Sequence, residues 1–228
     1  MGEFWSYTPS ILAGTWVNVA CGLTALVVSI IVGMAAALAK LSRQPVLVGA
    51  ASIYTTVVRG IPDLVLLLLA YYGGQIVVNS IVEALGSDEY YEISPFTAGA
   101  LAIGFIYGAY MTETFRGAIL AVPRGQLEAG YAYGMTASRV MRRILLPQMI
   151  RHALPSFGNN WLVLIKATAL LSAIQLEDMV RKARLAAGST HEPFNFYLFL
   201  AIIYLVITAV STWLLELARR RYSVGTQR

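Results

Sequence analysis

The stretch FWSYTPSILAGTWVNVACGLTALVVSIIVGMAAALA, residues 4–39, contains no charged side chain. A bilayer core of about 30 Å needs roughly 20 apolar helical residues, so this stretch predicts a transmembrane helix over about residues 11–40. The whole chain is similar in character: 57% of its 228 residues are hydrophobic and 13% are charged, with a mean hydropathy of +0.65. A soluble domain has roughly 25% charged residues. The composition predicts an all-α integral membrane protein. It excludes a soluble enzyme, a disordered chain and, despite a net charge of +5, a nucleic-acid-binding protein.

Four further spans are predicted from the remaining apolar runs, at about residues 46–82, 95–120, 154–176 and 194–217. We assign all five spans to one transmembrane domain, residues 1–228. The second run is longer than one bilayer crossing and contains Arg59-Gly60-Ile61-Pro62-Asp63. Because proline lacks a backbone donor, we expect a kink there, or a break that separates a cytoplasmic turn from the span itself.

Positively charged residues indicate the direction of the spans, because Lys and Arg collect in the cytoplasmic loops of membrane proteins. Here they follow the first, third and fifth spans, whereas acidic residues mark the opposite side. The basic residues are Lys40 and Arg43; Arg124, Arg139, Arg142, Arg143 and Arg151; and Arg219, Arg220, Arg221 and Arg228, and the acidic ones are Glu3, Asp88, Glu89 and Glu92. This pattern predicts an outside N-terminus and a cytoplasmic C-terminus. The exception is the predicted outer segment that contains Arg181, Lys182 and Arg184.

The cytoplasmic loop at about residues 122–153 is too polar to span the bilayer. Residues 126–133 predict a short helix, which Gly134 can end by adopting a left-handed conformation. Thr136 can cap a second short helix that runs to residue 143, and Pro147 and Pro155 are expected to limit helix continuity before the fourth span. The loop is therefore a compact pair of helices or, alternatively, a plain interfacial helix.

The loop also contains a motif with fixed spacing. Glu128-Ala129-Gly130 is followed after three residues by Gly134, and after nine more by Ile144-Leu145-Leu146-Pro147. This pattern resembles the "EAA" signature of bacterial ABC importer permeases, with Gly130 in place of the second alanine. The resemblance implies that the 126–143 loop is a coupling helix, which sits in a groove of a separate ATPase subunit. The residues that it assigns to coupling are Glu128, Ala129, Gly130, Gly134, Ile144, Leu146 and Pro147.

The resemblance extends over most of the chain. The segments that resemble polar amino-acid uptake permeases are residues 59–62, 112–119, 121–126 and 159–161, with Lys166. Asp63, residues 64–66 and the ending at 221–225 are similar to the Q-type permeases of histidine, lysine/arginine/ornithine and opine importers.

Membership of that group implies a type I importer fold in the bacterial inner membrane. It also implies transport of polar amino acids, with basic ones favoured, by alternating access. The implied partners are two ATPase subunits that carry ATP and magnesium, a periplasmic amino-acid binding protein and a second permease, with a paralogue favoured over a second copy. The resemblance implies no cofactor in this chain.

Several polar residues in the spans are candidates for a substrate path. A charge at the centre of a span costs about 2.5–3.5 kcal/mol, so each needs a reason. Arg59 with Asp63, and Glu113 with Arg116, have the spacing to pair on one helix face, which is the alternative to a transport role. The candidates are Asp63, Glu113, Asn160, Lys166, Thr168 and Ser172. Thr168 and Ser172 have helix packing as their alternative use. Many relatives have an acid where this chain has Ala167 and a glutamine where it has Leu66, which leaves open that the substrate contacts mainly the partner.

The sequence argues against catalysis in this chain. None of its lysines follows a glycine, so it has no GxxxxGK[ST] phosphate loop, and ATP hydrolysis is expected on another subunit. Cys21 is the single cysteine, and His152 and His191 lie far apart, so we expect no metal site. Gly99, Gly104 and Gly108 predict a close helix contact in the third span. The alternative function is an ion-coupled secondary amino-acid transporter.

Overall fold

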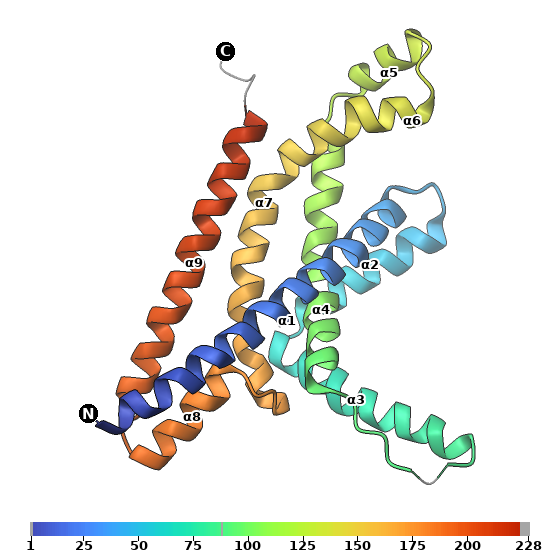
Figure 1. The fold of residues 1–228 in the computed structure, drawn as a ribbon. Helices are drawn as coiled ribbons and strands as arrows, with labels where there is room; N and C mark the ends of the chain where they lie inside the picture. Colours follow the sequence, from blue (N-terminus) through green and yellow to red (C-terminus); the bar gives the residue numbers. More distant parts are fainter. Residues whose placement is uncertain (1, 88, 224–228) are drawn as a thin grey trace.

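The computed structural model describes residues 2–87 and 89–223, and every element in these two ranges is helical. Figure 1 shows an open bundle in which α1 crosses the steeper helices α7 and α4, α2 lies beside α4, and α9 stands at the other side of α7. The elements are α1 (Gly2–Leu41), α2 (Pro45–Gly60), α3 (Asp63–Ala84), α4 (Pro95–Leu120), α5 (Arg124–Ala132), α6 (Ala137–Val140), the π-helical turn η1 (Met141–Leu145), α7 (Leu146–Ala167), the 3-10 helix η2 (Thr168–Ile174), α8 (Met179–Thr190) and α9 (Pro193–Ser223). Of the positions discussed above, Asp88, Val224, Gly225 and Arg228 lie outside the described ranges.

The centre of the bundle is the contact between α1 and α4, which have the most extensive interface in the fold. Their backbones approach closely because glycines face the partner helix. A Cβ atom added at Gly104 would lie 2.5 Å from Val28 Cβ, far inside an ordinary contact. The predicted close helix contact is therefore confirmed. Gly108 packs in the same way against Val32 of α1, and Gly99 against Leu171 of η2.

The predicted second span, 46–82, is two separate helices. α2 ends at Gly60, Ile61 and Pro62 have extended backbone angles, and α3 begins at Asp63. The expected interruption at the proline is therefore a complete break in the helix. It also separates Arg59 and Asp63, which lie in different helices and form no ion pair with each other, so their predicted pairing on one helix face is wrong.

The helical segment that contains the predicted fourth span, 154–176, begins earlier and is not interrupted by its prolines. α6, η1 and α7 follow one another without a gap, and Pro155 lies inside α7. The expectation that Pro147 and Pro155 limit helix continuity is wrong: the π-helical turn η1 leads directly into α7 just before Pro147, and α7 tolerates Pro155. The α-helix ends at Ala167, and η2 continues it to Ile174.

A buried polar network connects α1 to the turn between η2 and α8. The Asn18 amide donates to Asp178 Oδ2 at 3.1 Å and to Thr168 Oγ1 at 3.3 Å. Asn18 Oδ1 accepts from the Met179 N–H at 3.0 Å, and Asp178 caps α8 through the Arg181 N–H at 2.8 Å. Burial raises the pKa of the Asp178 carboxyl above its usual range, although these hydrogen bonds oppose the change. The network fixes α8 against the N-terminal half of α1.

Four helical stretches are long and apolar enough to cross a membrane: residues 4–41, 63–84, 137–174 and 193–221. The third predicted span has the same limits as α4, Pro95–Leu120, whose 26 residues give about 39 Å of helix, but α4 is not among these four stretches. In Figure 1, α5, α6 and the end of α9 lie at one end of the bundle, whereas the N-terminus, α8 and the α3–α4 connection lie at the other. The loop that resembles a coupling helix and the basic helix α8 are therefore at opposite ends.

Candidate functional site

The short helix α5 has a sharply defined end. It covers Arg124–Ala132, in agreement with the predicted helix at 126–133. Gly134 has a φ of +76°, which is the left-handed conformation expected from its position. Its N–H donates to Tyr131 O at 2.9 Å, and the Met135 N–H donates to Gly130 O at 3.1 Å, which completes a Schellman motif. By contrast, Thr136 precedes α6 but its side chain makes no capping hydrogen bond.

Gly130 holds α5 against the helix that leads into the membrane. It is buried, and a Cβ atom placed there would lie 2.6 Å from Ile144 Cδ1 and 3.1 Å from Val140 Cγ2. Ile144 belongs to η1 and Val140 to α6, both of which continue directly into α7. α5 is therefore packed directly against side chains of the helix that continues into α7.

Several residues of α5 and of the start of α7 are exposed. Glu128 and Ala129 are exposed on α5, and Leu146 and Pro147 are exposed at the start of α7. Two large aromatic side chains near the end of α5 are also exposed: Tyr131 by 53% and Tyr133 by 87%. These two tyrosines were not among the predicted coupling residues, although aromatic residues beside the motif were a usable signal for an interface.

A polar recess of about 430 Å³ opens between α2, α4 and α7. It brings together two of the predicted substrate-path residues, Glu113 and Asn160, and adds Arg59. The Asn160 amide donates to Thr114 Oγ1 at 3.0 Å, so part of its hydrogen-bonding capacity is used inside the wall. The residues that line the recess are Arg59, Tyr110, Glu113, Thr114, Pro155, Ser156, Asn159 and Asn160.

Glu113 is engaged by two cations. Lys40 Nζ lies 2.6 Å from Glu113 Oε1 and also 2.6 Å from Thr55 Oγ1, and Arg116 Nε lies 3.0 Å from Glu113 Oε2. The predicted pairing of Glu113 with Arg116 is confirmed. Lys40 was assigned only to the cytoplasmic charge cluster, and its contact with Glu113 joins α1, α2 and α4.

Arg59 and Asp63 instead find aromatic partners on α4. The Arg59 guanidinium lies over the Tyr110 ring, 5.3 Å from its centroid, and the Tyr107 hydroxyl donates to Asp63 Oδ2 at 3.0 Å. The two tyrosine rings are themselves 5.6 Å apart. Asp63 is not among the residues that line the polar recess.

The remaining candidates lie away from the recess. Lys166 is exposed near the end of α7, whereas Thr168 is fully buried and donates to Ile165 O at 2.7 Å while it accepts from Asn18. The Ser172 hydroxyl donates to Ala169 O at 3.0 Å within η2. Thr168 thus has the packing role that was the alternative to substrate contact.

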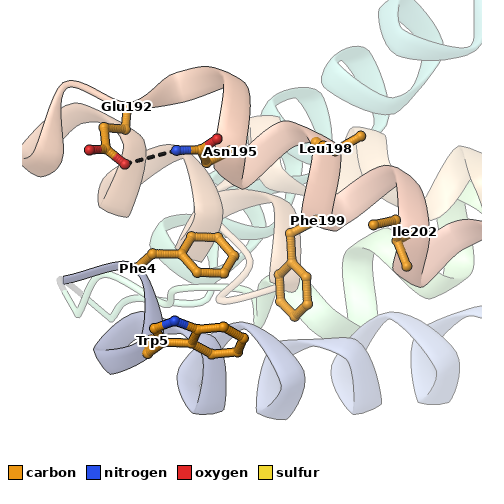
Figure 2. Close-up of a pocket in the computed structure, with 7 residues that line it drawn as sticks. All are labelled: Phe4, Trp5, Glu192, Asn195, Leu198, Phe199 and Ile202. Carbon is orange, nitrogen blue, oxygen red and sulfur yellow. Dashed lines mark hydrogen bonds between the residues drawn. The ribbon is translucent and has the colours of Figure 1, made fainter. Parts of the chain in front are cut away.

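A second pocket has the wrong chemistry for a polar solute. Figure 2 shows it between the starts of α1 and α9, where aromatic rings of Phe4, Trp5 and Phe199 gather. The acidic residue of this pocket, Glu192, accepts a hydrogen bond from the Asn195 amide at 2.9 Å. The other lining residues, Leu198 and Ile202, are aliphatic. Trp5 is 69% exposed, as expected for an aromatic side chain at a membrane interface.

Comparison with known proteins identifies the family. Residues 29–224 match the family model described as "Binding-protein-dependent transport system inner membrane component". The chain belongs to this family. As a member it is a multi-pass inner-membrane transport component and not an enzyme, and the family description implies a binding protein as a partner.

Curated members of the family are similar over nearly their full length. The chain is 48% identical to the histidine/lysine/arginine/ornithine transport system permease protein HisQ of Salmonella typhimurium, over 98% of both chains. It is 43% identical to the octopine transport system permease protein OccQ of Agrobacterium tumefaciens, over 98% of this chain and 94% of that protein. These matches confirm the resemblance to Q-type permeases of ABC importers.

Solved structures agree with the fold. An amino acid ABC transporter crystallised with histidines has a chain that matches with a TM-score of 0.80 and 34% identity, over 96% of both chains. An inward-facing MetNI methionine transporter matches with a TM-score of 0.72 at 16% identity, over 98% of this chain and 99% of the other, and so supports the fold alone.

Proposed function

We propose that this chain is one permease half of an ATP-driven importer that moves basic amino acids of the histidine, arginine, lysine, ornithine or opine type into the cytoplasm. The substrate class rests on the 48% identity to a permease named for four of these amino acids. The N-terminus is periplasmic and the C-terminus cytoplasmic, because more basic residues lie in α5, α6, η1 and the end of α9, at one end of the bundle, than in α8 at the other end.

The observation that carries the coupling mechanism is the packing of Gly130 against Ile144 and Val140. Two separate ATPase subunits bind ATP and magnesium, and their closure pushes α5. Because α5 ends in a fixed turn at Gly134 and rests on a helix continuous with α7, the push moves the transmembrane helix and switches the access of the substrate path. The exposed face with Glu128, Ala129, Leu146 and Pro147 is the ATPase contact.

A tag on the C-terminus tests the assembly. Purification of this chain from its native membrane is expected to bring an ATPase subunit and a second, paralogous permease. Recovery of two copies of this chain without a paralogue would refute the heterodimer, and recovery without an ATPase would refute the importer.

Uptake by the reconstituted complex separates the two candidate functions. Proteoliposomes with ATP inside and substrate-loaded binding protein outside should accumulate labelled arginine or histidine. Accumulation driven by an ion gradient, in the absence of ATP and binding protein, would instead establish a secondary transporter.

A further inference from the structure

The charge balance of the polar recess is opposite to that expected for a cation-binding site. Among the described residues that line it, Glu113 is the only acid, and Lys40 and Arg116 lie 2.6 Å and 3.0 Å from its two oxygens. A carboxylate that is already paired with two cations has little attraction left for a third. The recess therefore offers no free negative charge to the cationic side chain of an amino acid.

The Arg59 guanidinium is the charged group of the recess that is available to bind a ligand. It is exposed, and none of the carboxylates in residues 2–87 and 89–223 forms an ion pair with it. The Tyr110 ring, 5.3 Å away, supports the guanidinium by a cation–π contact and restricts its freedom. A guanidinium fixed in this way is suited to a carboxylate, which it can bind through two parallel hydrogen bonds.

The neighbouring groups fit the same ligand. Ser156 and Asn159 line the recess from α7 and are both exposed, so a hydroxyl and an amide from a second helix line the same recess as Arg59 of α2. Both can donate to an anion. The volume of about 430 Å³ is large enough for a single amino acid.

We propose that this recess binds the α-carboxylate of the transported amino acid, with Arg59 as the residue that recognises it. Glu113 holds α1, α2 and α4 together and does not select the cationic side chain. The inference rests on the proposed function, because every amino acid in the proposed class carries an α-carboxylate. Selection among amino acid side chains is then made elsewhere, on the binding protein or the partner permease.

The test measures direct binding of arginine to the purified complex in lipid nanodiscs, without binding protein. The matched probe is argininamide, in which a neutral amide replaces the carboxylate; histidine and histidinamide are used instead if histidine is the amino acid taken up. The wild-type complex should bind the amide at least tenfold more weakly, since charge-assisted hydrogen bonds are lost. Equal binding of the two probes, or no binding of the amino acid, would overturn the proposal.

A variant then assigns the effect to this chain. Arg59→Gln should reduce the arginine bound to this permease at least tenfold while leaving argininamide binding unchanged. Arg221→Gln, an exposed basic residue near the end of α9, is the control and should bind as wild type. An Arg59→Gln complex that assembles with its ATPase and binds arginine normally would refute the role of Arg59. Absence of ATP-driven uptake by the wild-type complex would refute the proposed function itself. This result can be distinguished from normal arginine binding by Arg59→Gln, which would refute only the role of Arg59.

Discussion

The close contact of α1 with α4 leads to a quantitative prediction for Gly104→Ala. The new Cβ would lie 2.5 Å from Val28 Cβ and 3.0 Å from the Ala25 carbonyl oxygen. Ordinary contact between carbon atoms is about 3.5–4.0 Å, so the helices must separate by about 1 Å. Neither neighbour can turn away, because one is attached directly to the backbone and the other is part of it.

The expected cost follows from two opposing contributions. Overpacking a core typically costs about 1–3 kcal/mol, and this rigid contact belongs at the upper end of that range. Alanine in place of glycine stabilises a helix by up to about 1 kcal/mol. The net loss in the free energy of unfolding is therefore about 1–2 kcal/mol, which lowers the melting temperature by about 2–4 °C for each kcal/mol.

The matched control lies on the same helix. A Cβ atom added at Gly117 would have no neighbour within 4 Å, so Gly117→Ala keeps only the favourable helix contribution. Both variants are compared with wild type by thermal unfolding of the purified complex at one heating rate, since membrane complexes often unfold irreversibly. A Gly104→Ala complex as stable as the Gly117→Ala complex would refute the packing argument.

Three further changes test other contacts. Asn18→Leu should cost about 2–4 kcal/mol in thermal unfolding, because Asp178 loses a buried hydrogen bond at 3.1 Å; a stability unchanged from wild type would contradict the network. Lys40→Met should cost about 1–3 kcal/mol in the same assay, because Glu113 keeps Arg116 alone, and the double variant with Glu113→Gln should recover part of that loss. Gly134→Ala should weaken ATPase co-purification, because its φ of +76° disfavours a side chain; equal recovery of the ATPase would argue against a required turn.

Local patterns in the sequence predict local structure well. The limits of α4 agree with the predicted span, and the left-handed residue after α5 is the glycine expected from its position. Both features depend on neighbouring residues: an apolar run bounded by proline, and a glycine that follows a short helix. The close packing of α4 was predictable for the same reason, since small residues at helical spacing create a surface that another helix can approach.

Contacts between distant residues were not predictable from spacing. Lys40 and Glu113 are 73 positions apart, and Asn18 and Asp178 are 160 apart. The pairing of Arg59 with Asp63 failed because the break at Ile61 and Pro62 separates residues that are close in sequence.

Of the prolines expected to interrupt a helix, most did not do so. Pro155 lies inside α7, where the lost backbone hydrogen bond is tolerated in a long helix supported by its neighbours. Pro62, Pro147 and Pro155 were each expected to interrupt a helix, and of these three only Pro62, in the extended segment before α3, does so.

The most direct test of coupling measures arginine uptake and ATP hydrolysis together in proteoliposomes that contain the Gly130→Leu complex. A side chain at Gly130 would push α5 away from Ile144 and Val140, so arginine imported per ATP hydrolysed should fall at least tenfold in the assembled complex. Gly125→Ala, in the same helix but with no neighbour within 4 Å of the added Cβ, should behave as wild type. A wild-type ratio of uptake to hydrolysis in Gly130→Leu would contradict the claim that α5 transmits the movement of the ATPase.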